Sequence, residues 1–161
     1  MKSWKNSASK LLVGLLTPLL LAHTTAQQGV TTKSTTENPG GDFTLISAEG
    51  PLPLKDLRGK VVLLFFGYTA CTTVCPVTLV TISRVFSKLP PDELQRVRAL
   101  FISLDPERDT PEMLKQYTGY FHPNIVGLTD RPEQVAQVAE KYGVRYEKQE
   151  LSDSALGYVI S

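Results

Sequence analysis

Sulfur and imidazole groups are scarce in this chain. Its 161 residues include two cysteines, Cys71 and Cys75, and two histidines, His23 and His122. Without a third cysteine the pair has no partner within the chain for disulfide exchange, so any thiol chemistry must use Cys71 and Cys75 together. Once the first 26 residues are set aside, His122 is the only imidazole left.

The N-terminus contains no long apolar run and no arginine. Three lysines precede an apolar stretch at residues 11–22, small residues follow it, and the first arginine is Arg58. A membrane-spanning helix needs about 20 apolar residues, and mitochondrial presequences are rich in arginine, so the pattern instead predicts a secretory signal peptide at residues 1–26. If it stays attached, residues 11–22 would be a membrane tether. We therefore expect a periplasmic or other extracytoplasmic location, where a dithiol persists only with a reductant or a protecting metal.

The chain also lacks an excess of charge. It carries 17 basic and 16 acidic residues, and three of the lysines lie within residues 1–26, so the remainder is weakly acidic. Nucleic-acid binding normally requires a basic surface, and we expect none here. Residues 27–41 are rich in Thr, Ser, Gln and Gly, which predicts a flexible tether. Residues 42–161 are long enough to bury the core of one domain.

The strand pattern of residues 42–161 predicts an α/β fold. Residues 61–66 are continuously apolar, which predicts a strand covered on both faces, and residues 98–104 predict a second buried strand. Residues 43–54 predict a hairpin with its turn at Gly50-Pro51, and residues 158–160 predict a final strand. Strands and helices alternate, so we expect a layered fold with a largely parallel centre.

The predicted helices have recognisable ends. Pro76 suits the first turn of a helix whose apolar stripe is Ile82, Val85, Phe86 and Leu89 and which stops at Pro90-Pro91. Two later helices each begin with Asp-x-Pro-Glu, where Asp109 and Asp130 are the expected N-terminal caps.

The cysteine pair lies between the first buried strand and the helix that begins near Pro76. Open α/β sheets place their sites at the carboxyl ends of strands, and a helix N-terminus favours a thiolate over a thiol. The four-residue spacing brings the two Cα atoms within roughly 6 Å on a helical turn, which suits either a disulfide or a shared soft metal ion. A purely stabilising disulfide is the weaker explanation, because so small a loop restricts the unfolded chain little.

These residues resemble the Sco (SenC) family, thioredoxin-like copper-binding assembly factors of cytochrome c oxidase. The resemblance covers residues 42–160. Its CxxxCP element is Gly67-Tyr68-Thr69-Ala70-Cys71-Thr72-Thr73-Val74-Cys75-Pro76. The three further matching segments are Ser103-Leu104-Asp105-Pro106-Glu107-Arg108-Asp109-Thr110-Pro111-Glu112, Gly127-Leu128-Thr129 and Asp42-Phe43-Thr44-Leu45. The resemblance implies a thioredoxin-like three-layer fold with a central mixed sheet. It also implies a bound copper ion, the copper-bearing subunit of the oxidase as a client, and a dithiol reductant as a second partner.

The resemblance further implies a ligand set that is incomplete here. In the family, copper is held by the two cysteines and a distal histidine, whereas Asp153 occupies the position of that histidine in this sequence. Two thiolates suit monovalent copper, but Asp153 is a hard donor and a poor replacement for imidazole, and an ordinary loop aspartate is the simpler interpretation. The strand and the helix with which relatives finish have no counterpart after Ile160, so the fold is expected to lack them.

Three functions remain open at this point. The first is a copper-binding metallochaperone, or thiol reductase, that assists assembly of the oxidase copper centre. The second is a metal-independent thiol-disulfide oxidoreductase, in which Cys71 attacks and Cys75 resolves. The third is a thiol peroxidase, since residues 72–75 match the TxxC motif, although Tyr68 stands where peroxiredoxins have proline. The other candidate ligands have structural explanations, namely a helix-end position for His122 and caps or turns for Asp105, Glu107 and Asp109.

Overall fold

The structure is a computed structural model that describes residues 39–152 and 154–161. The predicted signal peptide, most of the predicted tether and Asp153 lie outside the described residues. None of the helices within the described ranges is long and apolar enough to cross a membrane. In chain order the elements are β1 (Thr44–Ser47), β2 (Gly50–Pro53), the 3₁₀ turn η1 (Leu54–Leu57), β3 (Val61–Gly67), α1 (Val74–Phe86), α2 (Pro91–Leu94), β4 (Val97–Ser103), α3 (Pro111–Phe121), β5 (Ile125–Leu128), α4 (Pro132–Lys141), β6 (Lys148–Glu150) and β7 (Tyr158–Ile160).

The central sheet is parallel and has the strand order β3-β4-β5. The β1–β2 hairpin joins the far end of β5 through an antiparallel bridge, in which the backbone groups of Ile46 and Thr129 exchange hydrogen bonds of 2.8 and 2.9 Å. The sheet is therefore parallel at its centre and mixed at this edge, as the sequence predicted. β6 and β7 form a separate antiparallel hairpin, so the predicted strand at residues 158–160 exists but pairs with β6 rather than with the central sheet.

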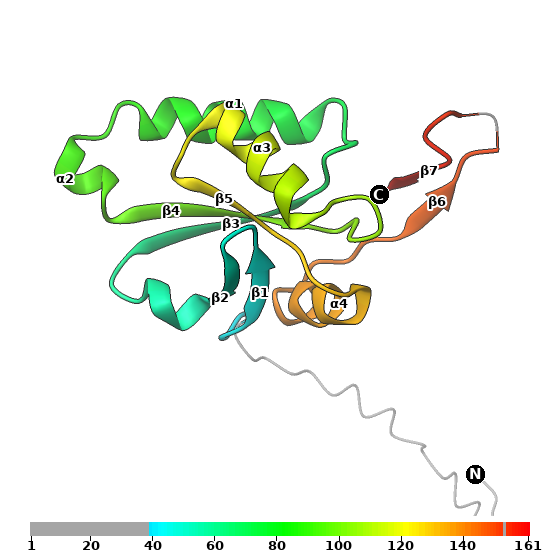
Figure 1. The fold of residues 1–161 in the computed structure, drawn as a ribbon, viewed down its shortest axis with the longest axis horizontal. Coiled ribbons are helices and arrows are strands. Elements are labelled where there is room, and N and C mark those ends of the chain that lie inside the picture. Colours follow the sequence, from blue (N-terminus) through cyan, green and yellow to red (C-terminus); the bar gives the residue numbers. More distant parts are fainter. Residues whose placement is uncertain (1–38, 153) are drawn as a thin grey trace, which may run out of the picture. The chain divides into compact units, whose positions relative to one another are not determined.

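The sheet is the middle one of three layers (Figure 1). α1 and α3 cover one face, where Leu79 and Leu114 pack against Phe101 of β4. α4 and the β1–β2 hairpin cover the other face, where Leu45 and Val138 pack against β4 from the opposite side. This arrangement confirms the predicted thioredoxin-like three-layer fold.

The most buried strand is β4, not β3. Val61 and Leu63 at the start of β3 are 62% and 38% exposed, whereas Phe101 in β4 is completely buried. β4 lies between two strands, while β3 pairs only with β4 among the described strands. The prediction that residues 61–66 are covered on both faces is therefore wrong for the first half of the strand.

Two local predictions were also wrong in position. The hairpin turn is at residues 48–49 rather than at Gly50-Pro51, because the Ser47 hydroxyl accepts from the Glu49 N–H and donates to the Gly50 carbonyl, which closes the turn earlier. In α1 the buried stripe is Cys75, Leu79 and Phe86, and Val85 is 52% exposed.

Candidate functional site

Cys71 and Cys75 lie at the carboxyl end of β3 and the N-terminus of α1, as predicted. Cys71 is half-buried in the connecting loop, and Cys75 is the second residue of the helix and only 5% exposed. Both cysteines are free thiols in this structure. The arrangement brings together one accessible sulfur and one buried sulfur, which is a suitable starting point for either metal binding or disulfide formation.

Gly67, the last residue of β3, leaves the space in which the buried thiol lies. A Cβ atom at this position would be 2.9 Å from Cys75 Sγ and 2.8 Å from the ring of Phe101. Contacts this short do not occur between real side chains, so any larger residue would displace the thiol or the ring. Gly67 is therefore part of the site, although it carries no reactive group.

The sulfur of Cys71 accepts a hydrogen bond at the start of α1. The Cys75 N–H donates to Cys71 Sγ over 3.3 Å, and the Cys71 N–H donates to the Tyr68 carbonyl over 3.2 Å. Thr73 is the N-cap residue of α1, but its side chain makes no capping bond. The Cys71 sulfur thus takes the place of a capping side chain, because it accepts from a backbone N–H in the first turn of the helix. The helix N-terminus in turn stabilises negative charge on this sulfur.

The two thiols differ in acidity. Burial raises the pKa of Cys71, but hydrogen bonds from the Cys75 thiol and from nearby backbone N–H groups outweigh burial, so the pKa lies below its ordinary value. Burial, followed by the hydrogen bond with Cys71, raises the pKa of Cys75 to about 12. Cys71 is therefore the more readily ionised and more nucleophilic position, and Cys75 tends to hold its proton.

A pocket of about 340 Å³ opens beside the sulfur atoms. Its apolar walls include the aromatic residues Phe66 and Tyr68. The loop after α4 and β7 close the other side through Tyr146 and Ile160. The thiols can therefore be reached through this pocket, whose lining is mainly apolar.

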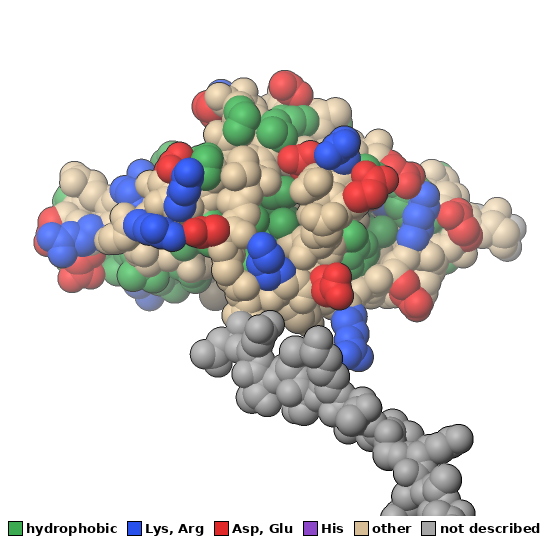
Figure 2. All heavy atoms as spheres, turned by 90° about the horizontal axis from the view of Figure 1, so that it is seen from below, with side chains coloured by type: hydrophobic (Ala, Val, Ile, Leu, Met, Phe, Trp, Pro, Cys, Tyr) green, Lys and Arg blue, Asp and Glu red, His purple; other side chains and the backbone are tan. Residues whose placement is uncertain are grey.

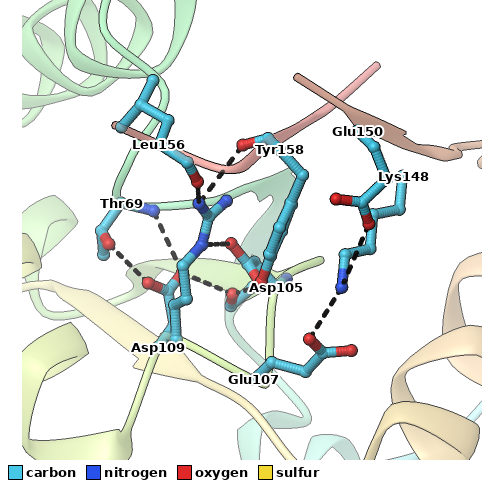
Figure 3. A network of polar contacts seen from close by, with 10 residues as sticks. Thr69, Asp105, Glu107, Asp109, Lys148, Glu150, Leu156 and Tyr158 are labelled. Atoms are coloured by element: carbon cyan, nitrogen blue, oxygen red, sulfur yellow. Dashed lines mark hydrogen bonds and ion pairs between the residues drawn. The ribbon is translucent and has the colours of Figure 1, made fainter. Parts of the chain in front are cut away.

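A buried polar network supports the loop that carries Cys71 (Figure 3). The Asp109 carboxylate accepts hydrogen bonds from the Thr69 N–H at 3.0 Å, from the Thr69 hydroxyl, and from the Ser103 hydroxyl at 2.6 Å. Ser103 in turn accepts the Asp105 N–H at 3.0 Å. The loop between β4 and α3 thus holds the loop between β3 and α1.

The same network holds the β6–β7 hairpin. The Tyr158 hydroxyl donates to Asp105 at 2.7 Å, and Arg108 pairs with Asp105 while donating to the backbone carbonyls of Leu156 and Tyr158. The Arg108 guanidinium and the Lys148 ammonium lie 3.7 and 3.9 Å from the centre of the Tyr158 ring. These contacts fix the hairpin whose connecting segment includes the position of Asp153.

Asp109 was predicted to cap α3, and that prediction was wrong. The cap is Thr110, whose hydroxyl accepts from the Met113 N–H at 3.2 Å, while Asp109 is 1% exposed and turned toward Thr69. Asp130 does not cap α4 either, because Arg131 is its N-cap residue and Asp130 only accepts the Arg131 N–H. The signal available for Asp109 was its place after β4, since the carboxyl ends of parallel strands lie at the same edge of a sheet.

The candidate third ligands do not join the cysteines among the described residues. Asp153 lies outside those residues, and residues 39–152 and 154–161 contain no group of three His, Cys, Asp or Glu side chains suited to a metal. His122 follows the C-terminal end of α3, roughly 16 Å along the helix axis from the end near Asp109. Its ring packs edge-on against Phe86 and accepts the Asn124 N–H, and burial lowers its pKa, so its role is structural.

The acidic residues near the site are already paired. Asp105 contacts Arg108 and Tyr158, and Glu107 contacts Lys148 at 2.9 Å, which leaves no cluster of free carboxylates for a hard cation in this described segment.

On the face formed by η1, the β1–β2 hairpin and α4, acidic and basic side chains are interspersed (Figure 2). The surface charge of that face thus resembles that of an ordinary soluble domain.

Comparisons with known proteins agree with this geometry. A family model described as SCO1/SenC matches residues 31–161. The mitochondrial Protein SCO1 homolog 1 of Arabidopsis thaliana is 40% identical over 116 residues, which are 71% of this chain and 35% of that protein. The chain spans between 35% and 59% of the length of the curated relatives that it matches.

Solved structures of Sco proteins share the fold. The solution structure of apo Sco1 from Thermus thermophilus has a TM-score of 0.68 and 43% identity, and the match covers 74% of this chain and 69% of that one. The copper-bound structure of ScoI from Bradyrhizobium japonicum has a TM-score of 0.69 and 40% identity, with 76% of each chain covered. On the strength of the matched segment, the cysteine geometry and the shared fold, the chain belongs to the SCO1/SenC family.

Proposed function

We propose that this protein carries a copper ion on Cys71 and Cys75 and assists assembly of the copper centre of cytochrome c oxidase. The observation that supports it best is the pair of free thiols at the start of α1, with one sulfur polarised by the helix and both facing a pocket. Family membership and the copper-bound relative from Bradyrhizobium japonicum support copper as the cargo. The cytochrome c oxidase client follows from the same family membership.

The donor set favours the monovalent ion. Two thiolates are soft donors and can hold monovalent copper alone, whereas divalent copper prefers additional nitrogen or oxygen donors. The described residues place no third His, Cys, Asp or Glu side chain beside the thiols. We therefore expect tight binding of monovalent copper and weak binding of the divalent ion, with Asp153 as a candidate but minor oxygen ligand.

The residues supply the binding chemistry in a simple way. Cys71 ionises first, because its sulfur accepts hydrogen bonds from the Cys75 thiol and from the Cys75 N–H. Cys75 gives up its proton when the copper ion arrives, because the cation compensates the second negative charge. The apolar pocket wall limits the access of water to the sulfurs. A client cysteine that enters through the pocket mouth would displace one thiolate at a time, which permits transfer without release of free copper.

A thiol-disulfide oxidoreductase is the second candidate, and the unequal acidity of the thiols favours it. The Cys71 thiolate would attack a client disulfide, form a mixed disulfide and release one client thiolate, which takes a proton. The Cys75 sulfur would then lose its proton, attack Cys71 and release the second client thiol, so two electrons pass to the client and the pair becomes a disulfide. A peroxidase is disfavoured, because the TxxC cysteine would be Cys75, which is buried and has a raised pKa.

The location of the protein is a further part of this proposal. We infer an extracytoplasmic site of action from residues 1–26 as a signal peptide, with residues 27–41 as the tether to a copper-binding domain at residues 42–161. A reductant in that compartment would be required to keep the two thiols available.

Anaerobic titration tests the proposal. The reduced chain is titrated with monovalent and with divalent copper in competition with a chromophoric chelator, beside a variant with both Cys71→Ser and Cys75→Ser. We expect one monovalent ion per chain, weak binding of the divalent ion and no binding by the double variant. Reduction of a peptide disulfide without copper binding would instead support the oxidoreductase.

A further inference from the structure

Asp109 is a buried carboxylate whose contacts all lead to the cysteine loop or to β4. It is 1% exposed and accepts three hydrogen bonds, two from Thr69 and one from Ser103 at the end of β4 (Figure 3). A buried carboxylate needs this many donors to offset the loss of water. No helix-capping role explains the burial, because Thr110 caps α3.

Thr69 connects this carboxylate to Cys71. Asp109 holds both the backbone N–H and the hydroxyl of Thr69, so it restrains the main chain as well as the side chain. One residue earlier, the Tyr68 carbonyl accepts the Cys71 N–H at 3.2 Å. Asp109 therefore connects Thr69 to Ser103 at the end of β4. The hydrogen bond from the Cys71 N–H to the Tyr68 carbonyl closes the turn that carries Cys71.

We propose that Asp109 is a positioning residue for the cysteine pair, which by holding Thr69 keeps the sulfur of Cys71 directed at the Cys75 N–H in the reduced protein. The inference rests on the proposed function, because it concerns the same two thiols. Copper binding and disulfide closure both require the sulfurs to converge. A loop that is already held in place loses less conformational freedom when they do.

The hydrogen-bond pattern allows geometry to be separated from charge. Asparagine at position 109 keeps one oxygen to accept from the Thr69 N–H and the Ser103 hydroxyl, and its amide can donate to the Thr69 hydroxyl after that hydroxyl rotates. Asp109→Asn therefore removes the charge and keeps the support, whereas Asp109→Ala removes both. At the other end of the contact, Thr69→Val removes one of the two bonds and Thr69→Ser keeps both.

The experiment compares two equilibria in the 161-residue chain and these four variants. One is the affinity for monovalent copper, measured anaerobically by chelator competition. The other is the equilibrium with glutathione, in which the Cys71–Cys75 dithiol gives two electrons and two protons to oxidised glutathione and yields the protein disulfide and two molecules of reduced glutathione. Tyr158→Phe is the matched control, because it removes a 2.7 Å hydrogen bond to Asp105 in the neighbouring arm of the network.

We expect Asp109→Ala to weaken copper binding and to shift the glutathione equilibrium toward the dithiol, each by about tenfold, with about threefold changes for Thr69→Val. Asp109→Asn, Thr69→Ser and Tyr158→Phe should stay within about twofold of the wild type in both equilibria, although Tyr158→Phe lowers the melting temperature. This pattern separates positioning from a general loss of stability.

Folded Asp109→Ala and Thr69→Val variants with both equilibria unchanged would overturn the inference. If Asp109→Ala does not fold, Thr69→Val decides alone, because Thr69 lies in a half-exposed turn. A change in Asp109→Asn as large as in Asp109→Ala would also overturn the inference. In that case the negative charge of Asp109, and not its hydrogen bonds to Thr69, would determine the two equilibria. A wild-type chain that binds no copper would contradict the proposed function, while the glutathione equilibrium would still test Asp109.

Discussion

At the scale of single residues, the site depends on the absence of a side chain at Gly67. The carboxyl end of β3 passes so close to α1 that a Cβ atom there would be 2.9 Å from the sulfur of Cys75. The buried thiol therefore occupies space that only glycine leaves open. Cys75 and Phe101 belong to the same buried cluster, and burial is the main cause that raises the pKa of Cys75.

We expect Gly67→Ala to lower the free energy of unfolding by about 1–3 kcal/mol, because the methyl group forces the thiol or the ring to move. Gly119→Ala is the matched control, since a Cβ atom at this exposed position in α3 meets nothing within 4 Å and should stabilise the helix by about 0.5–1 kcal/mol. Urea unfolding of the reduced chain measures both effects. Equal stability of Gly67→Ala and the wild type would show that the end of β3 is more adaptable than the structure indicates.

The unequal acidity of the thiols makes a second residue-scale prediction. Iodoacetamide near neutral pH should modify Cys71 first, because its pKa is lowered, and should reach Cys75 only at high pH or after unfolding, because its pKa is about 12. Peptide mapping by mass spectrometry gives the order. In Cys75→Ala, the loss of the side-chain donor that hydrogen-bonds Cys71 should slow alkylation of Cys71 at a given pH. Equal rates at the two cysteines of the wild type would refute the assignment.

At the scale of elements, local sequence patterns predicted where helices begin but not what each polar residue does there. Pro76, Pro111 and Pro132 lie in first helical turns, because proline lacks the N–H that those turns leave unpaired. Asp109 fits a cap equally well by local rules, and its bond to Thr69 joins residues 40 positions apart. Such a contact depends on the packing of β3 beside β4, which no local pattern contains.

The cap of α3 can be tested directly. We expect Thr110→Ala to lower the free energy of unfolding by about 1 kcal/mol, because the Met113 N–H loses its acceptor. Thr81→Ala is the comparison, since the exposed Thr81 hydroxyl only donates to the Val77 carbonyl within α1, and its loss should change stability by less than about 0.5 kcal/mol. Thermal unfolding of the two variants compares them. A larger effect at Thr81 than at Thr110 would contradict the assignment of the cap.

At the scale of the whole domain, the order of the layers followed from the alternation of strands and helices, but the depth of each strand did not. Val61 and Leu63 are as apolar as the residues of β4, yet they are exposed, because burial depends on which strands lie on either side. A similar limit applies to the site. The cysteines were visible as a spaced pair, whereas the contact between Asp109 and Thr69 required β3 and β4 to be placed side by side.

The buried acidic protons make the domain sensitive to alkaline pH. Burial is the main cause that raises the pKa of Cys75, Tyr117 and Tyr158 to about 12 in each case. In the unfolded chain a cysteine ionises near about pH 8.5 and a tyrosine near about pH 10. The stability tied to these protons is therefore complete below those values and is lost as the pH rises toward about 12.

We accordingly expect the melting temperature of the reduced chain to fall steadily above about pH 9. Tyr117→Phe should make this decline less steep, because phenylalanine has no hydroxyl proton that could ionise at high pH. The buried Tyr117 hydroxyl also has no hydrogen-bond partner among the described residues. Near neutral pH the variant should be no less stable than the wild type. Calorimetry from pH 7 to 11 tests this, and an unchanged slope in Tyr117→Phe would contradict the assignment.

The central claim is that Cys71 and Cys75 together hold monovalent copper, and copper-edge X-ray absorption tests it most directly. The reduced chain is loaded anaerobically with one equivalent of monovalent copper and compared with Cys71→Ser and with the double serine variant. The account predicts a monovalent ion with two sulfur ligands in the wild type, a lower sulfur count in Cys71→Ser and no retained copper in the double variant. Coordination mainly by nitrogen or oxygen in the wild type, or copper retained by the double variant, would contradict it.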